Sequence, residues 1–473
     1  MKLSVLIPVY NERYLVRQLV ERVLQAPLPD CMERELILVD DGSTDTSREI
    51  LETLAKQHTQ IRYVPHEKNL GKGAALRTAI AAATGDFCIF QDADLEYDPA
   101  DYARILEPLL GGQADVVYGS RFLPSERRRV LFFWHALGNT ALTMLSNMFT
   151  DLNLSDMETC YKAFRTDVLK SIPLRSACFG IEPEITAKVA KRGLRIYEVP
   201  IKYDGRTYLE GKKITWRDGF RALYVILKYR LIDDLYDPHF APEYLSDLAR
   251  THRVNHWIAD TLRPFLGHRV LEVGAGLGAM TMLLLPRERF VATETREGYL
   301  AVLRSLALRR SDIQIARLDP QQRRDFEPYN GKLDTLVCSG SLEHLADPAA
   351  ALRNFHAALE PSGRCVLRVP QGPWMFCPLD KTLGHQRRYT RRELTGALEA
   401  AGFQVEQLLD FNRFATVDWL LYGVLLRLPR LPRLQLKAFD TLVKVLRRLD
   451  WLLPWPGLDL IAVARKPAGL SPS

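Results

Sequence analysis

Three carboxylates follow one short apolar run in the N-terminal part of the chain. Residues 87–90 are typical of a buried strand, and Asp92, Asp94 and Glu96 come directly after them. Open α/β sheets bind ligands outside the carboxyl ends of their strands. A divalent cation that carries a diphosphate needs a few hard oxygen ligands and open coordination positions. The segment therefore predicts a site for a metal-bound nucleotide diphosphate, although an Asp-x-Asp by itself also fits a solvated turn.

Two further polar segments fall where strands are expected to end. Asp40 and Asp41 follow the second predicted strand, where a carboxylate can accept from a nucleobase ring N–H. Gly42 beside them permits a tight turn. The loop at residues 69–73 has glycines before a helix start, and its Lys72 suits a phosphate group. These two segments therefore predict a nucleobase contact and a phosphate contact near the carboxylates that follow residues 87–90.

The end of the first predicted strand completes the group. It offers a nucleoside an aromatic ring and polar groups from Pro8, Tyr10, Asn11 and Glu12. Each segment also has a structural explanation, such as a helix cap or an ordinary loop. Their shared position at predicted strand ends favours a nucleotide site.

Short apolar runs alternate with helical periodicity over the first 120 residues. This alternation predicts βαβ units and a mostly parallel sheet. The expected strands are Leu3–Pro8, Leu36–Asp40, Ile61–Pro65, Phe87–Gln91 and Val116–Gly119. A second series begins near residue 269, with strands expected at 270–273, 290–293, 335–338 and 365–369. We therefore predict an α/β domain at 1–231, a linker at 232–255, a second α/β domain at 256–467 and a disordered tail at 468–473.

Length and composition agree with two globular domains. The 473 residues exceed one ordinary core, and 47% apolar with 26% charged residues excludes disorder for most of the chain. The net charge of +7 is concentrated locally, and no nucleic-acid motif is present. The basic clusters suit phosphate groups or an anionic membrane, or form a solvated face: Arg127, Arg128, Arg129, Lys212, Lys213, Arg430, Arg433, Arg447 and Arg448.

The cysteines and the apolar runs bear on the compartment. Seven cysteines without a Cys-x-x-Cys predict reduced thiols in a cytoplasmic protein, and no signal peptide is expected. The run from Val130 to Phe149 lacks charged residues but holds His, Asn, Thr and Ser. It predicts a buried or membrane-surface helix rather than a span. We expect a cytoplasmic protein with peripheral contact at the inner face of the membrane.

Residues 2–230 resemble the family 2 glycosyltransferases of GT-A fold, especially the dolichol- or polyprenyl-phosphate mannosyltransferase branch. Further matches are Gly119–Phe122, Thr159–Arg165, Arg206 and Glu210–Ile214. The resemblance implies an inverting enzyme with Mg²⁺ or Mn²⁺ at Asp92, Asp94 and Glu96, although many relatives have Gln at the last position. It also implies a nucleoside-diphosphate sugar bound by Pro8, Tyr10, Asn11, Glu12, Asp40, Asp41, Lys72 and Asp92.

Four residues are expected to carry the transfer: Asp94, Arg121, Arg206 and Lys212. A lipid phosphate is already ionised at neutral pH, so cations and a metal suffice to orient it and no strong base is needed. We prefer this acceptor. A sugar hydroxyl would instead need a carboxylate base, and Glu182 or Glu184 could supply one. Members of that branch often carry transmembrane helices, which this sequence lacks, so membrane access would rest on peripheral helices such as residues 127–149.

The second series opens with a glycine-rich turn. Glu272 lies in the predicted strand at 270–273, and Gly274, Gly276 and Gly278 follow that strand. Glu294 ends the next strand, where its carboxylate can accept from both ribose hydroxyls. Residues 256–466 resemble class I S-adenosylmethionine-dependent methyltransferases. The supporting segments are Arg317–Pro320, with Asp319 at an adenine-contact position, Ser341–Pro348 and Leu359–Gly363. An NAD-binding domain remains the alternative.

No methyl-transfer base is singled out by the sequence, since methyl transfer often needs only in-line positioning. His344, His385 and Tyr389 are candidates, each also suited to a structural role. Residues 419–455 fit an acceptor lid, a membrane-facing surface or packed core. The prediction is a metal-dependent glycosyltransferase fused to a methyltransferase, with consecutive steps on one glycan or lipid-linked sugar. The alternative is a glycosyltransferase acting on a glycan hydroxyl, with a non-catalytic binding or scaffolding domain behind it.

Overall fold

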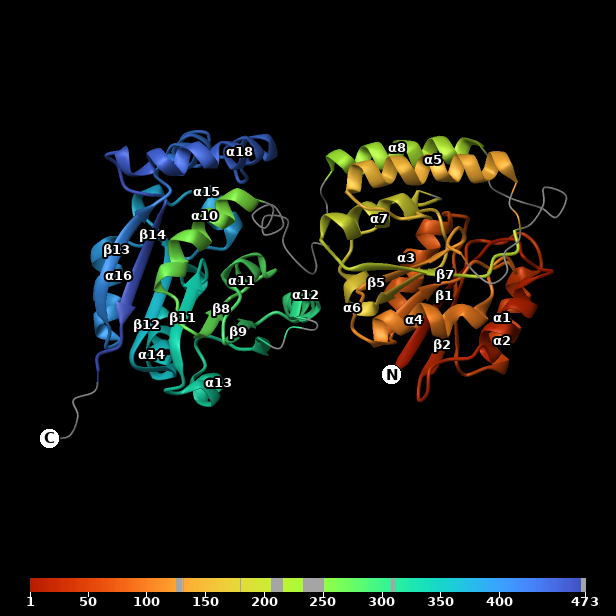
Figure 1. Cartoon of the computed structure of the whole chain (residues 1–473), viewed down its shortest axis with the longest axis horizontal. Helices are drawn as coiled ribbons and strands as arrows, with labels where there is room; N and C mark the ends of the chain where they lie inside the picture. Colours follow the sequence, from red (N-terminus) through yellow and green to blue (C-terminus); the bar gives the residue numbers. More distant parts are fainter. Residues whose placement is uncertain are drawn as a thin grey trace. The chain divides into compact units, whose positions relative to one another are not determined.

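The computed structural model describes residues 1–124, 130, 132–178, 180–205, 216–232, 251–307, 310 and 312–468. The chain divides into two compact units, Met1–Asp237 and Pro238–Ser473 (Figure 1). The predictions that concern Arg127–Arg129, Arg206, Lys212, Lys213, most of the linker and most of the tail fall outside the described residues.

The first unit is built on a seven-stranded sheet in the order β3-β2-β1-β4-β6-β5-β7. Its neighbours pair in parallel, except that β6 runs antiparallel to both β4 and β5. The strands are β1 (Lys2–Val9), β2 (Glu33–Asp40), β3 (Ile61–Pro65), β4 (Phe87–Phe90), β5 (Val116–Ser120), β6 (Lys162–Arg165) and β7 (Ile196–Pro200). Strands buried on both faces are expected to be almost wholly apolar, as β4 and the buried parts of β1 and β2 are. The five predicted strands are confirmed.

Helices surround this sheet. They are α1 (Val16–Gln25), α2 (Ser47–Gln57), α3 (Lys72–Ala82), the short η1 (Pro99–Asp101), α4 (Tyr102–Leu110), α5 (Phe133–Thr150), α6 (Thr166–Lys170), α7 (Ile181–Lys191) and α8 (Trp216–Leu231). Helices α5, α7 and α8 pack on one another, and Figure 1 shows α5 and α8 side by side beyond α7.

The second unit has its own seven-stranded sheet in the order β10-β9-β8-β11-β12-β14-β13. The strands are β8 (Arg269–Val273), β9 (Arg289–Glu294), β10 (Ile313–Arg317), β11 (Leu333–Ser339), β12 (Leu359–Pro370), β13 (Gln404–Phe411) and β14 (Asp459–Arg465). The first five pair in parallel, and β14 runs antiparallel to both β12 and β13. The four strands expected here are confirmed, while β10, β13 and β14 were not predicted.

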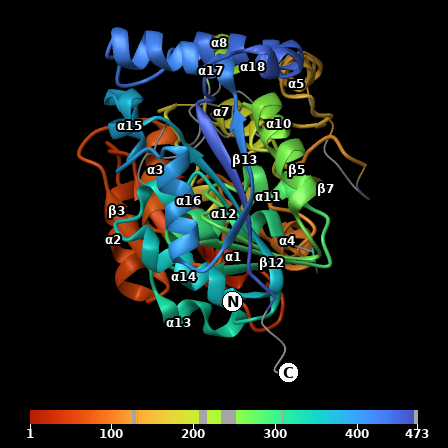
Figure 2. The same cartoon turned by 90° about the vertical axis from the view of Figure 1, so that its left-hand side faces the viewer.

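Both faces of the second sheet are covered. One core joins α10 (His252–Leu262), α11 (Ala279–Leu284), α12 (Glu297–Ala307) and α18 (Arg433–Leu449) to the sheet, and the other joins α13 (Arg323–Phe326), α14 (Pro348–Ala358) and α16 (Arg391–Ala400) (Figure 2). The remaining elements are α15 (Pro378–Leu383), α17 (Arg413–Asp418), η3 (Arg263–Phe265), η4 (Glu327–Tyr329), η5 (Leu342–His344), η6 (Pro373–Met375), η7 (Trp419–Leu425) and η8 (Asp450–Leu452). Both units are therefore α/β folds, as predicted.

Several helices carry large apolar side chains on their outer surface. On α5 and α8 these are Phe133, Trp134, Leu137, Met144, Met148, Phe220, Tyr224 and Leu227. In the second unit, Leu425, Leu434, Leu442, Val445 and Trp451 are exposed, so the stretch at 419–455 is not simply packed core. None of the described helices is long and apolar enough to cross a membrane.

Candidate functional sites

Asp40 and Asp41 are both buried and both already hydrogen-bonded. Asp40 accepts from the backbone N–H of Ser43 at 3.0 Å and from Nε of Arg48 at 2.9 Å. Asp41 accepts from the backbone N–H groups of Leu70 and Gly71, at 2.9 and 2.7 Å, and contacts His66. These carboxylates therefore fix the turn after β2 and the loop before α3, and this places that loop at the carboxyl edge of the sheet.

Glycines before α3 allow a second segment to cross over its first turn. A Cβ on Gly71 would lie 2.3 Å from the carbonyl oxygen of Ala177, and one on Gly73 would lie 2.2 Å from that of Ser176. The backbone N–H of Ala74 donates to Ala177 O at 3.1 Å. The physical requirement for these glycines is thus close backbone approach, which the sequence alone did not reveal.

Lys72 joins two carboxylates that are far apart in the sequence. Its ammonium group lies 2.8 Å from Oδ1 of Asp92, at the end of β4, and 2.9 Å from Oε1 of Glu182, in the first turn of α7. Burial lowers the pKa of Lys72, but the two carboxylates outweigh it and raise the pKa well above its usual value. Lys72 is therefore a permanent cation at the strand end where the diphosphate is expected.

Asp94 and Glu96 lie two and four residues beyond Asp92. Both are half-buried, and Oδ1 of Asp94 accepts from the backbone N–H of Glu96 at 3.1 Å. The phenol of Tyr203, just after β7, donates to Oε2 of Glu96 at 2.7 Å. Sequence patterns did not point to Tyr203, because its partner is 107 residues away. Carboxylate oxygens are the ligands that a hard divalent cation prefers. Among the described residues, however, the ligand atoms of Asp92, Asp94 and Glu96 do not all lie within 4.8 Å of one another, so the structure does not bring the expected metal ligands together.

Nucleoside contacts were expected at the end of β1. Pro8 is half-buried, and Tyr10 beyond it is 38% exposed. Asn11 has a positive φ of 51°, and its side-chain oxygen accepts from the backbone N–H of Thr44 at 2.8 Å. The backbone N–H of Glu12 donates to the hydroxyl of Ser47 at 2.9 Å. These bonds tie the end of β1 to the turn after β2, so the expected nucleoside contacts come together at one edge.

Arg121 follows β5 and forms a buried bidentate ion pair. Its Nε and Nη2 donate to the two carboxylate oxygens of Asp156 at 2.7 and 2.8 Å, and Nη2 also lies 3.1 Å from Oδ1 of Asn139 on α5. Its guanidinium carbon is 5.2 Å from the ring centroid of Tyr203. Arg121 thus connects β5, α5 and the segment before β6, and Asp156 was not predicted as its partner.

The two carboxylates proposed as bases have different surroundings. Glu184 accepts from the backbone N–H groups of Arg175 and Ser176, at 2.7 and 2.6 Å, and pairs with Lys188 at 2.7 Å. It therefore holds the segment that crosses α3. Glu182 pairs with Lys72, which also pairs with Asp92. Nearby Glu158 was not predicted; burial, with the charge of Glu182, raises its pKa to about 8.

In the second unit the glycine-rich turn joins β8 to α11. Gly274, Gly276 and Gly278 all have positive φ, at 72°, 57° and 79°. A Cβ on Gly274 would lie 2.0 Å from the hydroxyl oxygen of Ser341, after β11. Glu294, which ends β9 and is half-buried, accepts from the backbone N–H of Gly276 at 3.0 Å. The acidic side chain therefore borders the turn, as a ribose ligand must.

Asp319 and Glu272 complete the expected cofactor residues. Asp319 follows β10 at the same edge and accepts from the backbone N–H of Gln321 at 3.0 Å. Glu272 lies beneath the turn and accepts from the hydroxyl of Thr281. Burial, reinforced by the charge of Glu294, raises the pKa of Glu272 to about 7. Glu272 therefore supports the turn from below, since it is buried, while Glu294 and Asp319 border the open edge.

The three candidate bases differ in setting. His344 is in η5, with Nδ1 at 3.0 Å from the carbonyl oxygen of Gly384, and burial lowers its pKa. His385 has Nδ1 at 2.8 Å from Oδ1 of Asp380. The hydroxyl of Tyr389 is buried and has no hydrogen-bond partner among the described residues. The two histidines lie together, with ring centroids 5.0 Å apart.

Comparisons with family models match a different family to each of the two units. Residues 4–172 match the model of glycosyl transferase family 2, and residues 244–408 match a methyltransferase domain model. The chain carries a family 2 glycosyltransferase domain and a methyltransferase domain. Its predicted class, a transferase, is thereby confirmed, and the two matched ranges fall in separate units of the structure.

Two curated proteins and one solved structure illustrate the relatives of the glycosyltransferase domain. The chain is 28% identical to dodecaprenyl-phosphate galacturonate synthase of Rhizobium johnstonii, over 60% of this chain and 75% of that protein. It is 27% identical to dolichol-phosphate mannosyltransferase of Pyrococcus furiosus, over 48% of this chain and 64% of that protein. Glucosyl-3-phosphoglycerate synthase of Mycobacterium tuberculosis, solved with Mn²⁺, UDP and phosphoglyceric acid, is 22% identical over 49% of this chain and 80% of its own, with a TM-score of 0.39.

Proposed function

We propose that the chain transfers a hexose from a nucleoside-diphosphate sugar to a polyprenyl phosphate with inversion, and that its second domain methylates a product in the same series of steps. The observation that carries the first part is the ion triplet of Lys72, Asp92 and Glu182 at the carboxyl edge of the sheet. The triplet consists of a half-buried cation between two carboxylates. The relatives are named for transfer to polyprenyl or dolichol phosphate, which supports the acceptor class.

In this proposal Asp92, Asp94 and Glu96 hold Mg²⁺ or Mn²⁺, which would neutralise the departing diphosphate. Lys72 also binds the diphosphate in this proposal, because its ammonium group lies 2.8 Å from the proposed metal ligand Asp92. Pro8, Tyr10 and the turn after β2 hold the nucleoside. Arg121 orients the acceptor phosphate, together with Arg206 and Lys212, which lie outside the described residues.

The surroundings of the two candidate bases bear on the choice between a phosphate acceptor and a sugar hydroxyl. Glu184 is engaged by two backbone N–H groups and by Lys188. Glu182 pairs with Lys72 through Oε1, and its Oε2 has no hydrogen-bond partner among the described residues. A hydroxyl nucleophile needs a carboxylate that can take its proton, whereas a phosphate nucleophile needs only cations to position it. The proposal therefore assigns Glu184 to positioning, and Glu182 is the base that a sugar-hydroxyl acceptor would use.

For the second domain, the proposal assigns the turn after β8 and the carboxylate of Glu294 to S-adenosylmethionine. The cofactor would supply the methyl group as a sulfonium. The half-buried Glu294 already accepts from Gly276 N–H, so a ribose placed on the turn would meet its carboxylate. Asp319 extends this edge toward the adenine. The alternative is a non-catalytic second domain that binds the lipid-linked product. In that case, adding S-adenosylmethionine would not change the products.

The test is mass spectrometry of lipid products from purified protein, polyprenyl phosphate, Mg²⁺ and a panel of nucleoside-diphosphate sugars, with and without S-adenosylmethionine. We expect a sugar-phosphate lipid from one donor, and an added methyl mass only when the cofactor is present. If a donor binds but gives no such lipid, the acceptor is a glycan or protein hydroxyl. If the mass never gains a methyl, the shared-substrate part of the proposal is wrong.

Peripheral membrane contact would give the active site access to a lipid acceptor. Phe133 and Trp134, 69% and 79% exposed, begin the outer face of α5. Cationic side chains lie at the other end of this helix layer: the guanidinium carbon of Arg230 is 4.4 Å from the ring centroid of Phe149. Apolar side chains with neighbouring cations are typical of helices that lie in the surface of an anionic bilayer.

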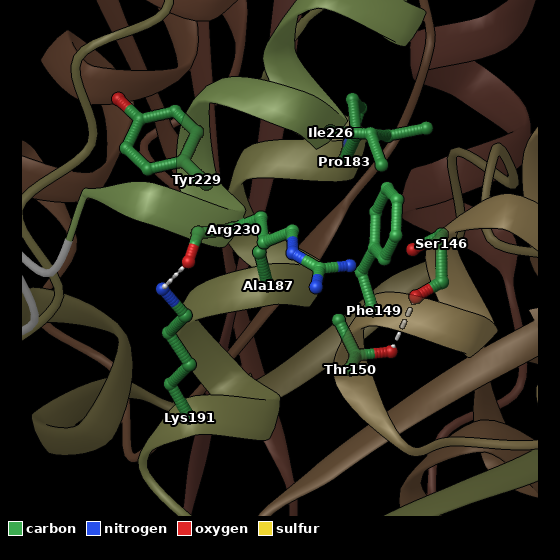
Figure 3. A pocket seen from close by; sticks show the side chains of 9 residues that line it. All are labelled: Ser146, Phe149, Thr150, Pro183, Ala187, Lys191, Ile226, Tyr229 and Arg230. Carbon is green, nitrogen blue, oxygen red and sulfur yellow. Dashed lines mark hydrogen bonds between the residues drawn. The ribbon is translucent and has the colours of Figure 1, made fainter.

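A small hollow with room for about one water molecule lies where α5, α7 and α8 meet (Figure 3). Its walls are mostly apolar, and two basic residues come close to one another in it: the ammonium group of Lys191 donates to the backbone carbonyl of Arg230 at 3.2 Å. The lining residues are Ser146, Phe149, Thr150, Pro183, Ala187, Lys191, Ile226, Tyr229 and Arg230.

Changing both Phe133 and Trp134 to Glu is expected to weaken binding to vesicles that contain anionic lipid by about 10-fold or more, because each buried aromatic side chain contributes about 1.5–3 kcal/mol. Flotation of the full chain with vesicles measures this binding. Tyr14→Glu is the matched control, since Tyr14 is 79% exposed on another part of the same unit. Equal flotation of the double variant and the control would show that α5 does not face the membrane.

A further inference from the structure

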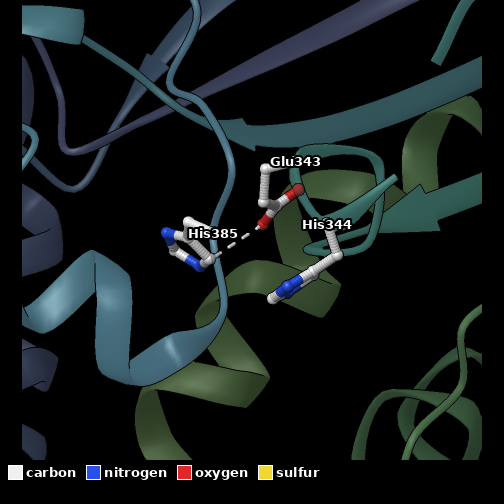
Figure 4. A group of neighbouring side chains, drawn as sticks. All are labelled: Glu343, His344 and His385. Atoms are coloured by element: carbon white, nitrogen blue, oxygen red, sulfur yellow. Dashed lines mark ion pairs between the residues drawn. The ribbon is translucent and has the colours of Figure 1, made fainter. Parts of the chain in front are cut away.

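Three side chains to which the proposed function assigns no role converge in the methyltransferase domain. Glu343 and His344 are in η5, which follows β11, and His385 follows α15. A ligand atom from each of the three lies within 4.8 Å of the others, and Figure 4 shows the side chains facing one another across a small gap. Oε1 of Glu343 is 3.8 Å from Nε2 of His385. That separation is too long for a hydrogen bond.

The 3.8 Å separation between Glu343 and His385 is in the range of two ligands on one ion. Imidazole nitrogens and carboxylate oxygens coordinate transition metals at about 2.0–2.2 Å, so two such donors on a common ion lie about 3–4 Å apart. Two imidazoles with one carboxylate form a donor set that favours Zn²⁺, Co²⁺ or a related divalent transition metal over Mg²⁺ or Ca²⁺. Open positions would remain for an oxygen ligand from outside the protein.

Hydrogen bonds orient both imidazoles in the manner of metal ligands. Nδ1 of His385 lies 2.8 Å from Oδ1 of Asp380, and Nδ1 of His344 lies 3.0 Å from the carbonyl oxygen of Gly384. Both partners are acceptors, so in the neutral rings the proton is on Nδ1 and the lone pair is on Nε2. Outer hydrogen bonds of this kind fix the tautomer of metal-bound histidines. Asp380 is itself held by Nε of Arg388 at 2.8 Å.

Glu343 supplies an independent indication of a missing partner. Glu343 is only 3% exposed, and its Oε2 has no hydrogen-bond partner among the described residues. A buried carboxylate oxygen without a partner is costly unless a cation or a donor satisfies it. The backbone around it is well fixed, because Gln386 donates from its backbone N–H to the carbonyl of Glu343 and from its side chain to that of His344, both at 2.9 Å.

We propose that Glu343, His344 and His385 bind a divalent transition-metal ion, and that this ion holds an oxygen of the methyl acceptor. The second clause rests on the proposed methyl transfer. The position fits it: Ser341, two residues before Glu343, reaches the carbonyl of Gly274 in the turn after β8 at 3.4 Å. The ion would therefore lie beside the cofactor turn, where an acceptor oxygen must approach. The site is separate in the chain from the carboxylates after β4.

Titration of the chelator-treated full chain with Co²⁺, followed by its visible absorption, tests the site directly. The wild type should bind one Co²⁺ with histidine ligation. His385→Asn and Glu343→Gln should weaken that binding by about 100-fold or more, and Asp380→Asn by about 10-fold, within the range for outer-sphere partners. His356→Asn is the matched control, because His356 is in the same unit and packs against Phe403. It should bind Co²⁺ like the wild type.

Glu343→Gln also controls for folding, because it removes a buried unpartnered charge and should not destabilise the domain. Unchanged Co²⁺ spectra in both His385→Asn and Glu343→Gln would overturn the metal site. S-adenosylmethionine binding is measured on the same samples. Cofactor binding without Co²⁺ binding would overturn this inference and leave methyl transfer standing. Co²⁺ binding without cofactor binding would support the metal site and contradict the proposed methyltransferase activity.

Discussion

Replacing Asp94 by Ala should lower sugar transfer by about 100-fold or more, the loss typical of removing one group that stabilises transition-state charge. S-adenosylmethionine binding should not change, because the two domains are separate compact units. The variant should remain folded, since Asp94 is only half-buried and lies in the loop beyond β4, where it accepts from Glu96 N–H at 3.1 Å. Product formation and cofactor binding are measured on the same preparation.

Asp98→Ala is the matched control for this variant. Asp98 is four residues away, and its carboxylate caps η1 by accepting from the backbone N–H of Ala100 at 3.0 Å. It should keep most of the sugar transfer. If Asp98→Ala and Asp94→Ala lose activity equally, the effect comes from the loop as a whole and not from a metal ligand.

Glu294→Ala should have the reciprocal effect. Two charge-assisted hydrogen bonds to a ribose contribute about 1.5–3 kcal/mol each, so cofactor affinity should fall by about 100-fold or more. Sugar transfer should persist. Glu297→Ala, on the exposed start of α12, is the control and should bind the cofactor normally. Loss of both activities in either Asp94→Ala or Glu294→Ala would contradict independent domains.

The strands with continuous apolar runs could be predicted because burial on both faces selects such residues. Strand β6 could not be, since it has four residues and begins with Lys162. That lysine is buried, and its ammonium group donates to the carbonyls of Met157 and Thr159, a contact that forms only in the folded chain. Strand β14 is apolar in sequence, but its antiparallel position between β12 and β13 is a matter of topology and not of local pattern.

For the site residues, too, the sequence predicted local features but not contacts between distant residues. Polar and charged residues near predicted strand ends were enough to select Lys72, Asp92 and Glu294 as candidate site residues. The partner that Lys72 finds in Glu182 is 110 positions along the chain, and no spacing rule connects them. Glu182 was considered as a base because its carboxylate was visible in the sequence, whereas its ion pair was not. Charge pairing across a fold depends on tertiary packing, so the roles of these residues were harder to predict than their presence.

Replacing Arg121 by Ala should destabilise the first unit by about 3–5 kcal/mol, because it leaves the carboxylate of Asp156 buried without its cation. Asp156 is fully buried and receives the Nε, Nη2 and backbone N–H of Arg121 at 2.7, 2.8 and 3.0 Å. Arg121→Lys should recover only part of this, since an ammonium group cannot make the bidentate pair. Hydrogen exchange of residues 116–165 measures the loss within this unit.

The double variant Arg121→Met, Asp156→Asn separates stability from acceptor binding. It removes both charges while the new amide side chain keeps an acceptor oxygen for the backbone, so stability should largely return. Sugar transfer should stay low with a raised KM for the polyprenyl phosphate, because the guanidinium proposed to orient the acceptor is still missing. If transfer returned together with stability, Arg121 would be a purely structural residue, and the acceptor phosphate would have to depend on the cations of the segment that contains Arg206 and Lys212.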